Sequence, residues 1–129
     1  MQGAGTFSVE LKFESPHDVV EAVALARADG DKKFVSGPLS GSSRVEMLSC
    51  RDGESGAAAY VALERFNGIL EGKSGGFVLM HSGVMTKEAQ TLAVSVVPGS
   101  GTGELRGIAG SMTIEIEEGS HRYGFEWTI

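Results

Sequence analysis

Two ionisable side chains occupy positions that alternate with apolar ones, as groups facing an apolar interior would. Glu64 alternates with apolar residues of AAAYVALERFNG (57–68), and His81 with those of GGFVLMHSGVM (75–85). A carboxylate near an imidazole in an apolar cavity suits general acid–base catalysis, because burial raises the pKa of the carboxyl group and a neighbouring carboxylate raises that of the imidazole. The chemistry expected is isomerisation, cyclisation or lyase chemistry without a cofactor.

Other polar residues extend this hypothesis. Glu104, which follows a glycine-rich turn, is a third candidate catalytic residue. The candidate ligand-binding residues are Arg27, Tyr60, His121, Tyr123 and Trp127. A tyrosine hydroxyl could stabilise a developing oxyanion. The alternative for each group is a solvated strand end, and a one-residue slip at a bulge would expose Glu64 and bury Arg65 instead.

The sequence contains no pattern typical of a metal or nucleotide site. His17, His81 and His121 lie far apart, with no HxH or HxxxH pair, so we predict no metal and no cofactor. The segment VVPGSGTGELRGIAGSM (96–112) has five glycines but no lysine, and its glycine spacing does not continue into a dinucleotide fingerprint. A strand-like run follows it, so its glycines predict a bend or bulge in the chain.

The elements that must position these residues are strands. Apolar residues recur with a period of two, and glycine-rich turns separate the runs. The predicted strands are 7–13, 23–36, 45–48, 57–68, 75–85, 91–97, 112–118 and 121–129. Such a series predicts an all-β protein, a small closed antiparallel barrel of about eight strands. Ser15 and Pro16 resemble a helix start, so we expect at most a short helical turn near 16–22.

Size and charge limit the functions available. A chain of 129 residues predicts a single domain spanning 1–129. Its net charge of −6 argues against nucleic-acid binding and against association with anionic membranes. No stretch of 18 apolar residues and no signal-peptide pattern is present, and the lone Cys50 cannot form an internal disulfide. We therefore expect a cytoplasmic protein.

Part of the chain also resembles a known family. AYVALERFNGILEGKSGGFVLMHSGVM, followed by VVPGSGTGELRGIAGSMTIEIEEGSHRYGFEWTI, is similar to a bacterial family known as domain of unknown function 3224. The resemblance covers residues 43–129 well and 1–42 more loosely. The glycine pattern of 101–110 more distantly resembles allene oxide cyclase and dirigent proteins. This resemblance implies an eight-stranded barrel with a lipocalin-like interior, but no activity. The helix-like stretch 15–28 departs from the family's strand-like second segment.

Three functions remain open from the sequence. The barrel could bind a hydrophobic small molecule and perform acid–base chemistry on it. It could carry such a molecule without turnover, or it could be a packed structural module that serves assembly. The expected outer face carries apolar residues such as Val61 and Leu63, and contact with another protein chain would bury them. We therefore expect a homo-oligomer, most simply a dimer.

Overall fold

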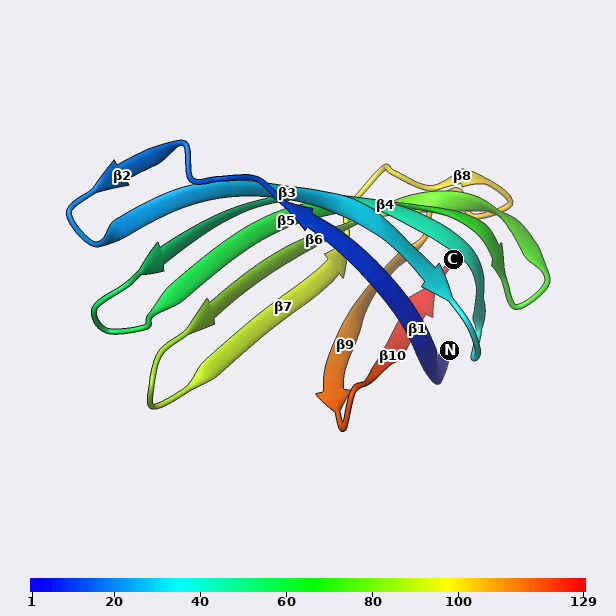
Figure 1. Ribbon diagram of the computed structural model, residues 1–129. Helices are drawn as coiled ribbons and strands as arrows, with labels where there is room; N and C mark the ends of the chain where they lie inside the picture. The colour runs from blue at the N-terminus through cyan, green and yellow to red at the C-terminus, as the bar shows by residue number, and fades with distance from the viewer.

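The computed structural model describes all 129 residues, and every regular element in it is a strand (Figure 1). None of its elements is a helix with the length and apolar character needed to cross a membrane. The strands are β1 (Gln2–Phe13), β2 (Asp18–Val20), β3 (Val23–Phe34), β4 (Leu39–Asp52), β5 (Ala58–Leu70), β6 (Lys73–Met85), β7 (Gln90–Val96), β8 (Thr102–Gly103), β9 (Ala109–Glu117) and β10 (Ser120–Thr128).

Eight of these strands close an antiparallel barrel, which confirms the predicted fold class. Their order is β1-β10-β9-β7-β6-β5-β4-β3, and β3 pairs with β1 to close the circle. The two short strands lie outside it: β2 pairs with β3, and β8 pairs with β6. Closure leaves the barrel strands with few free edges, which stabilises a sheet of this size.

The sequence allowed at most a short helical turn near 16–22, and no helical turn forms there. The chain instead runs through the short strand β2 and returns as β3, with Val19 opposite Ala24 and Val20 opposite Val23. Glu21 adopts a positive φ of 54° in the connecting turn. β-branched valines favour this extended hairpin. The adjacent strand offers a hydrogen-bonding ladder that outweighs the local helix signals of Ser15 and Pro16. The strand predicted at 23–36 is confirmed as β3.

The side chains of the barrel strands alternate between the interior and the outside. On β5, Ala62, Glu64 and Phe66 are buried, whereas Val61 and Leu63, on either side of Ala62, are exposed. No bulge shifts this alternation before Glu64, since β4 and β5 pair residue for residue from Leu39 to Arg51. The carboxylate of Glu64 therefore points into the barrel.

One half of the barrel is filled by an aromatic core. The rings of Phe34 and Phe66 meet edge to face with centroids 5.4 Å apart, and Phe125 stacks on Trp127 at 5.3 Å. Such pairs stabilise a core beyond the apolar area they bury. Leu105 and Ile108, from the loop between β8 and β9, are buried in the same cluster. This loop therefore plugs one end of the barrel.

The glycines of 96–112 allow backbones to pack closely at this plugged end. A Cβ atom on Gly101 would lie 2.1 Å from the carbonyl oxygen of Leu105, and one on Gly110 would lie 2.2 Å from that of Glu126. Both distances are far shorter than van der Waals contact, so a side chain does not fit. The segment shapes the barrel end, as its strand-like surroundings predicted.

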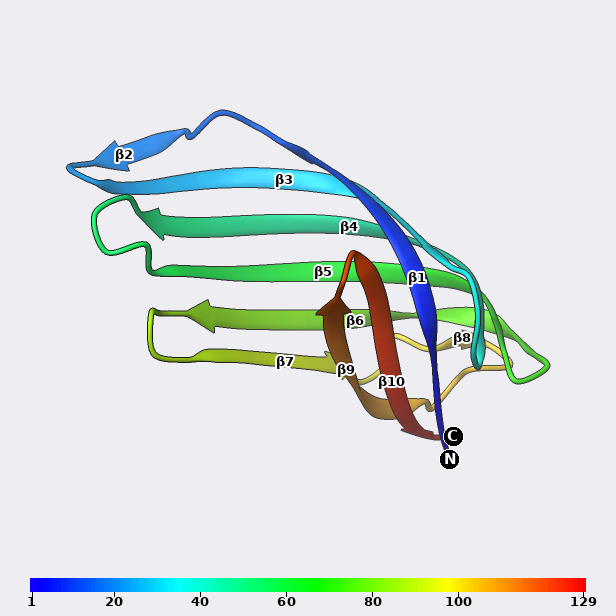
Figure 2. The same cartoon turned by 60° about the horizontal axis from the view of Figure 1, so that its bottom comes forward.

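The other half of the barrel is open. Strands β3–β7 run well past the ends of β9 and β10 (Figure 2). β7 pairs with β9 at only two positions, Val94 with Met112 and Ser95 with Ser111. The first residues of β7 and the last residues of β9 therefore diverge, and the interior between them is not filled by the core.

Candidate functional site

The open half of the barrel contains an apolar cavity. Its volume is about 630 Å³, and 18 of its 29 lining residues are hydrophobic. This volume lies in the range typical of small-molecule sites. Arg51, Ala58, Met85 and Gln90, which stand at strand ends, belong to its rim. Because the lining is mostly apolar, the few polar side chains in the cavity identify where chemistry can occur.

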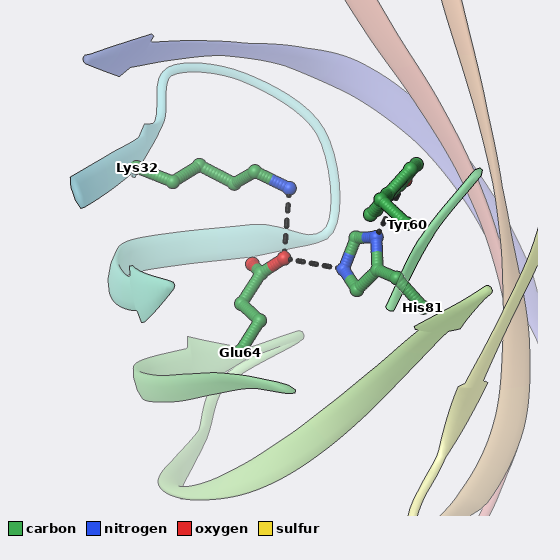
Figure 3. A network of polar contacts seen from close by, with 4 residues as sticks. All are labelled: Lys32, Tyr60, Glu64 and His81. Carbon is green, nitrogen blue, oxygen red and sulfur yellow. Dashed lines mark hydrogen bonds and ion pairs between the residues drawn. The ribbon is translucent and has the colours of Figure 1, made fainter. Parts of the chain in front are cut away.

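Three of these polar side chains meet at the floor of the cavity, next to the aromatic core (Figure 3). Oε1 of Glu64 lies 2.9 Å from Nζ of Lys32 and 2.9 Å from Nε2 of His81. The three residues are 0%, 4% and 5% exposed, respectively. They form a single buried network that ends in the cavity.

The register of the strands brings these residues together. His81 on β6 is opposite Ala62 on β5, so it lies two positions from Glu64 on the same inner face. Lys32 on β3 is opposite Ser43 on β4, and its long side chain extends across β4 toward Glu64. Residues separated by up to 49 positions in the chain thus share one site.

Lys32 carries a charge that the barrel must stabilise. Burying an ammonium group is unfavourable unless the charge is paired. Here the carboxylate of Glu64 provides the opposite charge. The face of the Phe7 ring, whose centroid is 4.3 Å from Nζ, adds a cation–π contact. Both contacts offset part of the cost of burying the ammonium group.

The pKa of Glu64 is lowered to about 2, opposite to the direction predicted from the sequence. Burial is the largest single influence and acts to raise this pKa. The hydrogen bond from His81 and the charge and hydrogen bond of Lys32 together outweigh burial. Glu64 is therefore ionised at neutral pH, and it does not serve as a proton donor.

An ionised Glu64 determines which nitrogen of His81 carries hydrogen. A carboxylate only accepts hydrogen bonds, so Nε2 of His81 carries the hydrogen and donates it to Glu64. In the neutral imidazole Nδ1 is then an acceptor, and the hydroxyl of Tyr60 lies 3.4 Å from it. Burial, and secondarily the charge of Glu64, raise the pKa of Tyr60, which keeps that hydroxyl protonated. Nδ1 is the basic atom of the network.

The second carboxylate oxygen of Glu64 has no hydrogen-bond partner. Ser43 faces the same carboxylate and helps to lower the pKa of Glu64, although its hydroxyl makes no hydrogen bond of ordinary geometry. Buried polar atoms without partners are rare in folded proteins. The Lys32 and His81 contacts are therefore the ones that hold the carboxylate in place.

The structure brings four of the predicted site residues to the cavity. Glu64 and His81 meet at its floor, and Tyr60 lies next to them. The fourth is His121, whose half-buried ring packs against Phe7 at a centroid distance of 5.3 Å. His121 makes no hydrogen bond to the network. It therefore lines the cavity wall and is not placed to transfer a proton within the network.

Two predicted residues are exposed on the outside. The side chain of Arg27 points away from the interior, because its neighbours Ala26 and Ala28 face inward on β3. Glu104 lies in the turn after β8, where its carboxylate accepts a hydrogen bond from the backbone N–H of Ser74 at 3.0 Å. The structure therefore brings neither residue to the cavity.

Two predicted residues belong to the packed core instead. The hydroxyl of Tyr123 donates to the carbonyl oxygen of Ser36 at 2.9 Å and accepts from the N–H of Leu39 at 3.1 Å. Trp127 stacks on Phe125 at the plugged end. Both side chains are buried, and neither lines the cavity. In the structure they hold the barrel together.

Sequence reasoning missed Lys32. The signal was present, because counting back by two from the buried Phe34 places Lys32 on the inner face and Lys33 on the outer face. The helix-like residues before β3 obscured the phase of this alternation. No group of three or more His, Cys, Asp or Glu side chains is arranged to hold a metal ion.

Comparison with known proteins finds relatives without an assigned function. Residues 3–127 match the model of a family described as "Protein of unknown function (DUF3224)". The chain is also similar to the crystal structure, at 1.84 Å resolution, of a protein with unknown function from the DUF3224 family from Shewanella oneidensis MR-1. The two are 42% identical with a TM-score of 0.93, over 100% of this chain and 96% of that chain. Comparison with curated proteins gives no match.

Proposed function

The chain belongs to the DUF3224 family of proteins of unknown function, and from its site we propose that the barrel binds a hydrophobic small molecule on which His81 acts as a general base. One observation carries this proposal. The network of Lys32, Glu64 and His81 lies at the floor of an apolar cavity and leaves Nδ1 of His81 as an acceptor next to that cavity.

The geometry supports proton abstraction from the bound molecule. Nδ1 of His81 takes the proton, and Glu64 orients the ring through Nε2–H and stabilises the imidazolium that forms. Nδ1 has one lone pair, so the Tyr60 hydroxyl, 3.4 Å from it, gives way to the ligand when the proton is transferred. Glu64 is thus a positioning residue, whereas His81 is the group that touches the ligand. Many isomerisations, cyclisations and eliminations begin with such a step.

The cavity also helps to distinguish a ligand-binding protein from a packed structural module. A fully packed structural module has no use for an apolar interior of about 630 Å³, so the cavity favours a ligand. A carrier without turnover uses the same cavity. The carrier differs from a catalyst in that it does not need His81 as a base. The experiment that separates these two functions therefore concerns His81.

Binding is tested on protein purified gently from its own host. Native mass spectrometry is expected to find one small molecule per chain, which denaturation releases. Ala26→Phe, which fills the cavity wall, should carry none, whereas Ala93→Phe on the exposed face of β7 should still carry it. A wild-type protein that carries nothing and binds neither of two added apolar probes, 2-methoxynaphthalene and 2-naphthol, would contradict the binding proposal.

Proton abstraction is tested with the molecule recovered in that experiment. His81→Gln keeps a hydrogen-bond donor for Glu64 but removes the base, so turnover should fall by about 10²–10⁴. His17→Gln changes an exposed histidine outside the cavity and should leave turnover unchanged. Equal activity of both variants and the wild type would mean that His81 is not the base. A bound molecule that no protein form converts would identify a carrier.

We further propose that the chain forms a homodimer through the outside of the barrel. Leu48 is opposite Val61, and Leu63 is opposite Met80, on the outer face of β4–β6. These four side chains are between 41% and 55% exposed and adjoin one another. An apolar group of this kind on a barrel wall supports contact with a second copy.

We also propose that the protein works in a reducing compartment such as the cytoplasm, which the free Cys50 supports.

The wider relation to allene oxide cyclase and dirigent proteins also remains a proposal. The closed eight-stranded antiparallel barrel with one open end supports it. Fold alone does not transfer an activity, so the function proposed above rests on the site.

A further inference from the structure

The charges at the cavity floor restrict the ligand that it can accept. Lys32 and Glu64 neutralise each other, and His81 in its neutral form adds no charge. The remaining ionisable side chains that line the cavity are His121, Tyr60, Cys50, Glu14 and Arg51. None of these forms an ion pair with the floor network. A ligand with a permanent charge would therefore be buried there without an opposite charge, which is unfavourable.

The same floor offers both an acceptor and donors. Nδ1 of His81 accepts a hydrogen bond, and its contact with Tyr60 is long, at 3.4 Å. The ammonium group of Lys32 has three N–H donors, of which one binds Glu64. The ammonium group and Nε2 of His81 contact the same oxygen of Glu64, so the ammonium is separated from Nδ1 by this contact and one imidazole ring. A single ligand hydroxyl suits this pair of partners.

We infer that the ligand is an uncharged apolar molecule with one weakly acidic hydroxyl, an enol or a phenol, and that the cavity holds its conjugate base beside protonated His81. This inference rests on the proposed function and specifies its ligand. The hydroxyl O–H bond breaks, the proton moves to Nδ1, and the electron pair stays on the ligand oxygen. The total charge of the site does not change.

The resulting order of charges explains why this state is favourable. Lys32 is positive, Glu64 negative, His81 positive and the ligand oxygen negative, so unlike charges adjoin along the network. The ligand oxygen accepts hydrogen bonds from the free N–H donors of Lys32 and from Tyr60. In an apolar cavity such interactions are stronger than in water. An oxyanion is therefore stabilised only when the base next to it has been protonated.

Four probes with one apolar body test this inference on the full-length protein. They are 2-naphthol, 2-methoxynaphthalene, 2-naphthoate and 2-naphthylmethylammonium. We expect 2-naphthol to bind at least about tenfold more tightly than the other three, the gain of one hydrogen bond to a charged group. We also expect the naphtholate absorption band in bound 2-naphthol, with an ionised fraction at pH 7 at least tenfold above that in buffer.

Each result decides between the inference and the proposed function. Equal binding of 2-naphthol and 2-methoxynaphthalene, or tightest binding of either charged probe, overturns the inference about ligand class but leaves binding intact. Tight binding of 2-naphthol without the naphtholate band overturns the proton transfer. If none of the four probes binds, the proposed function itself fails.

Two variants test whether His81 is the residue that takes the proton of bound 2-naphthol. His81→Gln should bind 2-naphthol no better than 2-methoxynaphthalene and should show no naphtholate band. His17→Gln, at an exposed position outside the cavity, should behave as the wild type. A naphtholate band that persists in His81→Gln would assign the proton to another group and overturn the inference. The comparison of the four probes on the wild type stands even if His81→Gln does not fold.

Discussion

At the scale of single residues, Lys32 contributes a charge and a hydrogen bond that help to lower the pKa of Glu64. Without it, burial and one hydrogen bond from His81 would act on Glu64, and burial raises the pKa of a carboxyl group. With Lys32 present, the carboxylate is ionised, and Nδ1 of His81 is the atom that we propose as the base. The assignment of His81 as the proposed base thus depends in part on one buried ammonium group.

We predict that Lys32→Met strongly destabilises the fold. It leaves the Glu64 carboxylate buried without its opposite charge, and breaking a buried pair in this way costs about 3–5 kcal/mol. Lys33→Met, at the exposed neighbouring position, should change stability by less than about 0.5 kcal/mol. Urea unfolding at pH 7 measures both. Equal free energies of unfolding would show that the pair contributes nothing.

We also predict an acid-sensitive contribution from Glu64. Its pKa in the folded protein, about 2, lies below its ordinary value of 4.5, so it stabilises the fold above pH 4.5. This contribution, about 3 kcal/mol from a shift of this size, is lost as pH falls from 4.5 toward 2. The stability advantage of wild type over Glu64→Gln should therefore shrink across that range. An advantage that stays constant with pH contradicts this assignment.

At the scale of elements, the strands show two features. Their side chains alternate between the inside and the outside of the barrel, and their backbones approach closely at glycines. The strand β5 places Glu64 inside because Ala62 and Phe66 on either side are apolar and buried. Glycines then allow neighbouring strands to approach where the barrel narrows at its plugged end. Both features can be read from short stretches of sequence, because each depends on neighbours along the chain.

We predict opposite effects for two glycine-to-alanine changes. In Gly110→Ala the new Cβ would lie 2.2 Å from a backbone oxygen, so the strands must shift, at about 1–3 kcal/mol. In Gly53→Ala the nearest atom is 3.6 Å away, which is ordinary contact, and the loss of unfolded-state freedom should leave stability equal or higher. Thermal unfolding compares the two, and a stable Gly110→Ala would refute the packing argument.

At the scale of the whole molecule, the barrel is divided into a packed half and an open half. Aromatic rings and the plug residues Leu105 and Ile108 fill one end, which frees the other end to hold a cavity. The buried charges of Lys32 and Glu64 lie where the two halves meet. The packed half thus supplies the rigidity that holds the network in place.

The proposed dimer makes a prediction at this scale. Leu63→Lys places a charge in the exposed apolar group on β4–β6 and should convert a dimer to a monomer in light scattering at micromolar concentration. Glu115→Lys, exposed on β9, changes the charge on another part of the barrel wall and should leave the dimer intact. A wild-type monomer at that concentration would contradict the dimer proposal.

The all-β class and the eight barrel strands could be predicted from the sequence alone, because an alternation of period two and glycine turns are local signals. The sequence made Glu64 and His81 candidates for the inner face but left a one-residue slip open. Only the tertiary structure decided that 15–30 forms a hairpin, that Lys32 joins Glu64, and that Glu104, Arg27, Tyr123 and Trp127 lie away from the cavity. These outcomes depend on the register of strands remote in the chain. The pKa of Glu64 is lowered because the hydrogen bond from His81 and the charge and hydrogen bond of Lys32 together outweigh burial, and no local pattern contains these contacts.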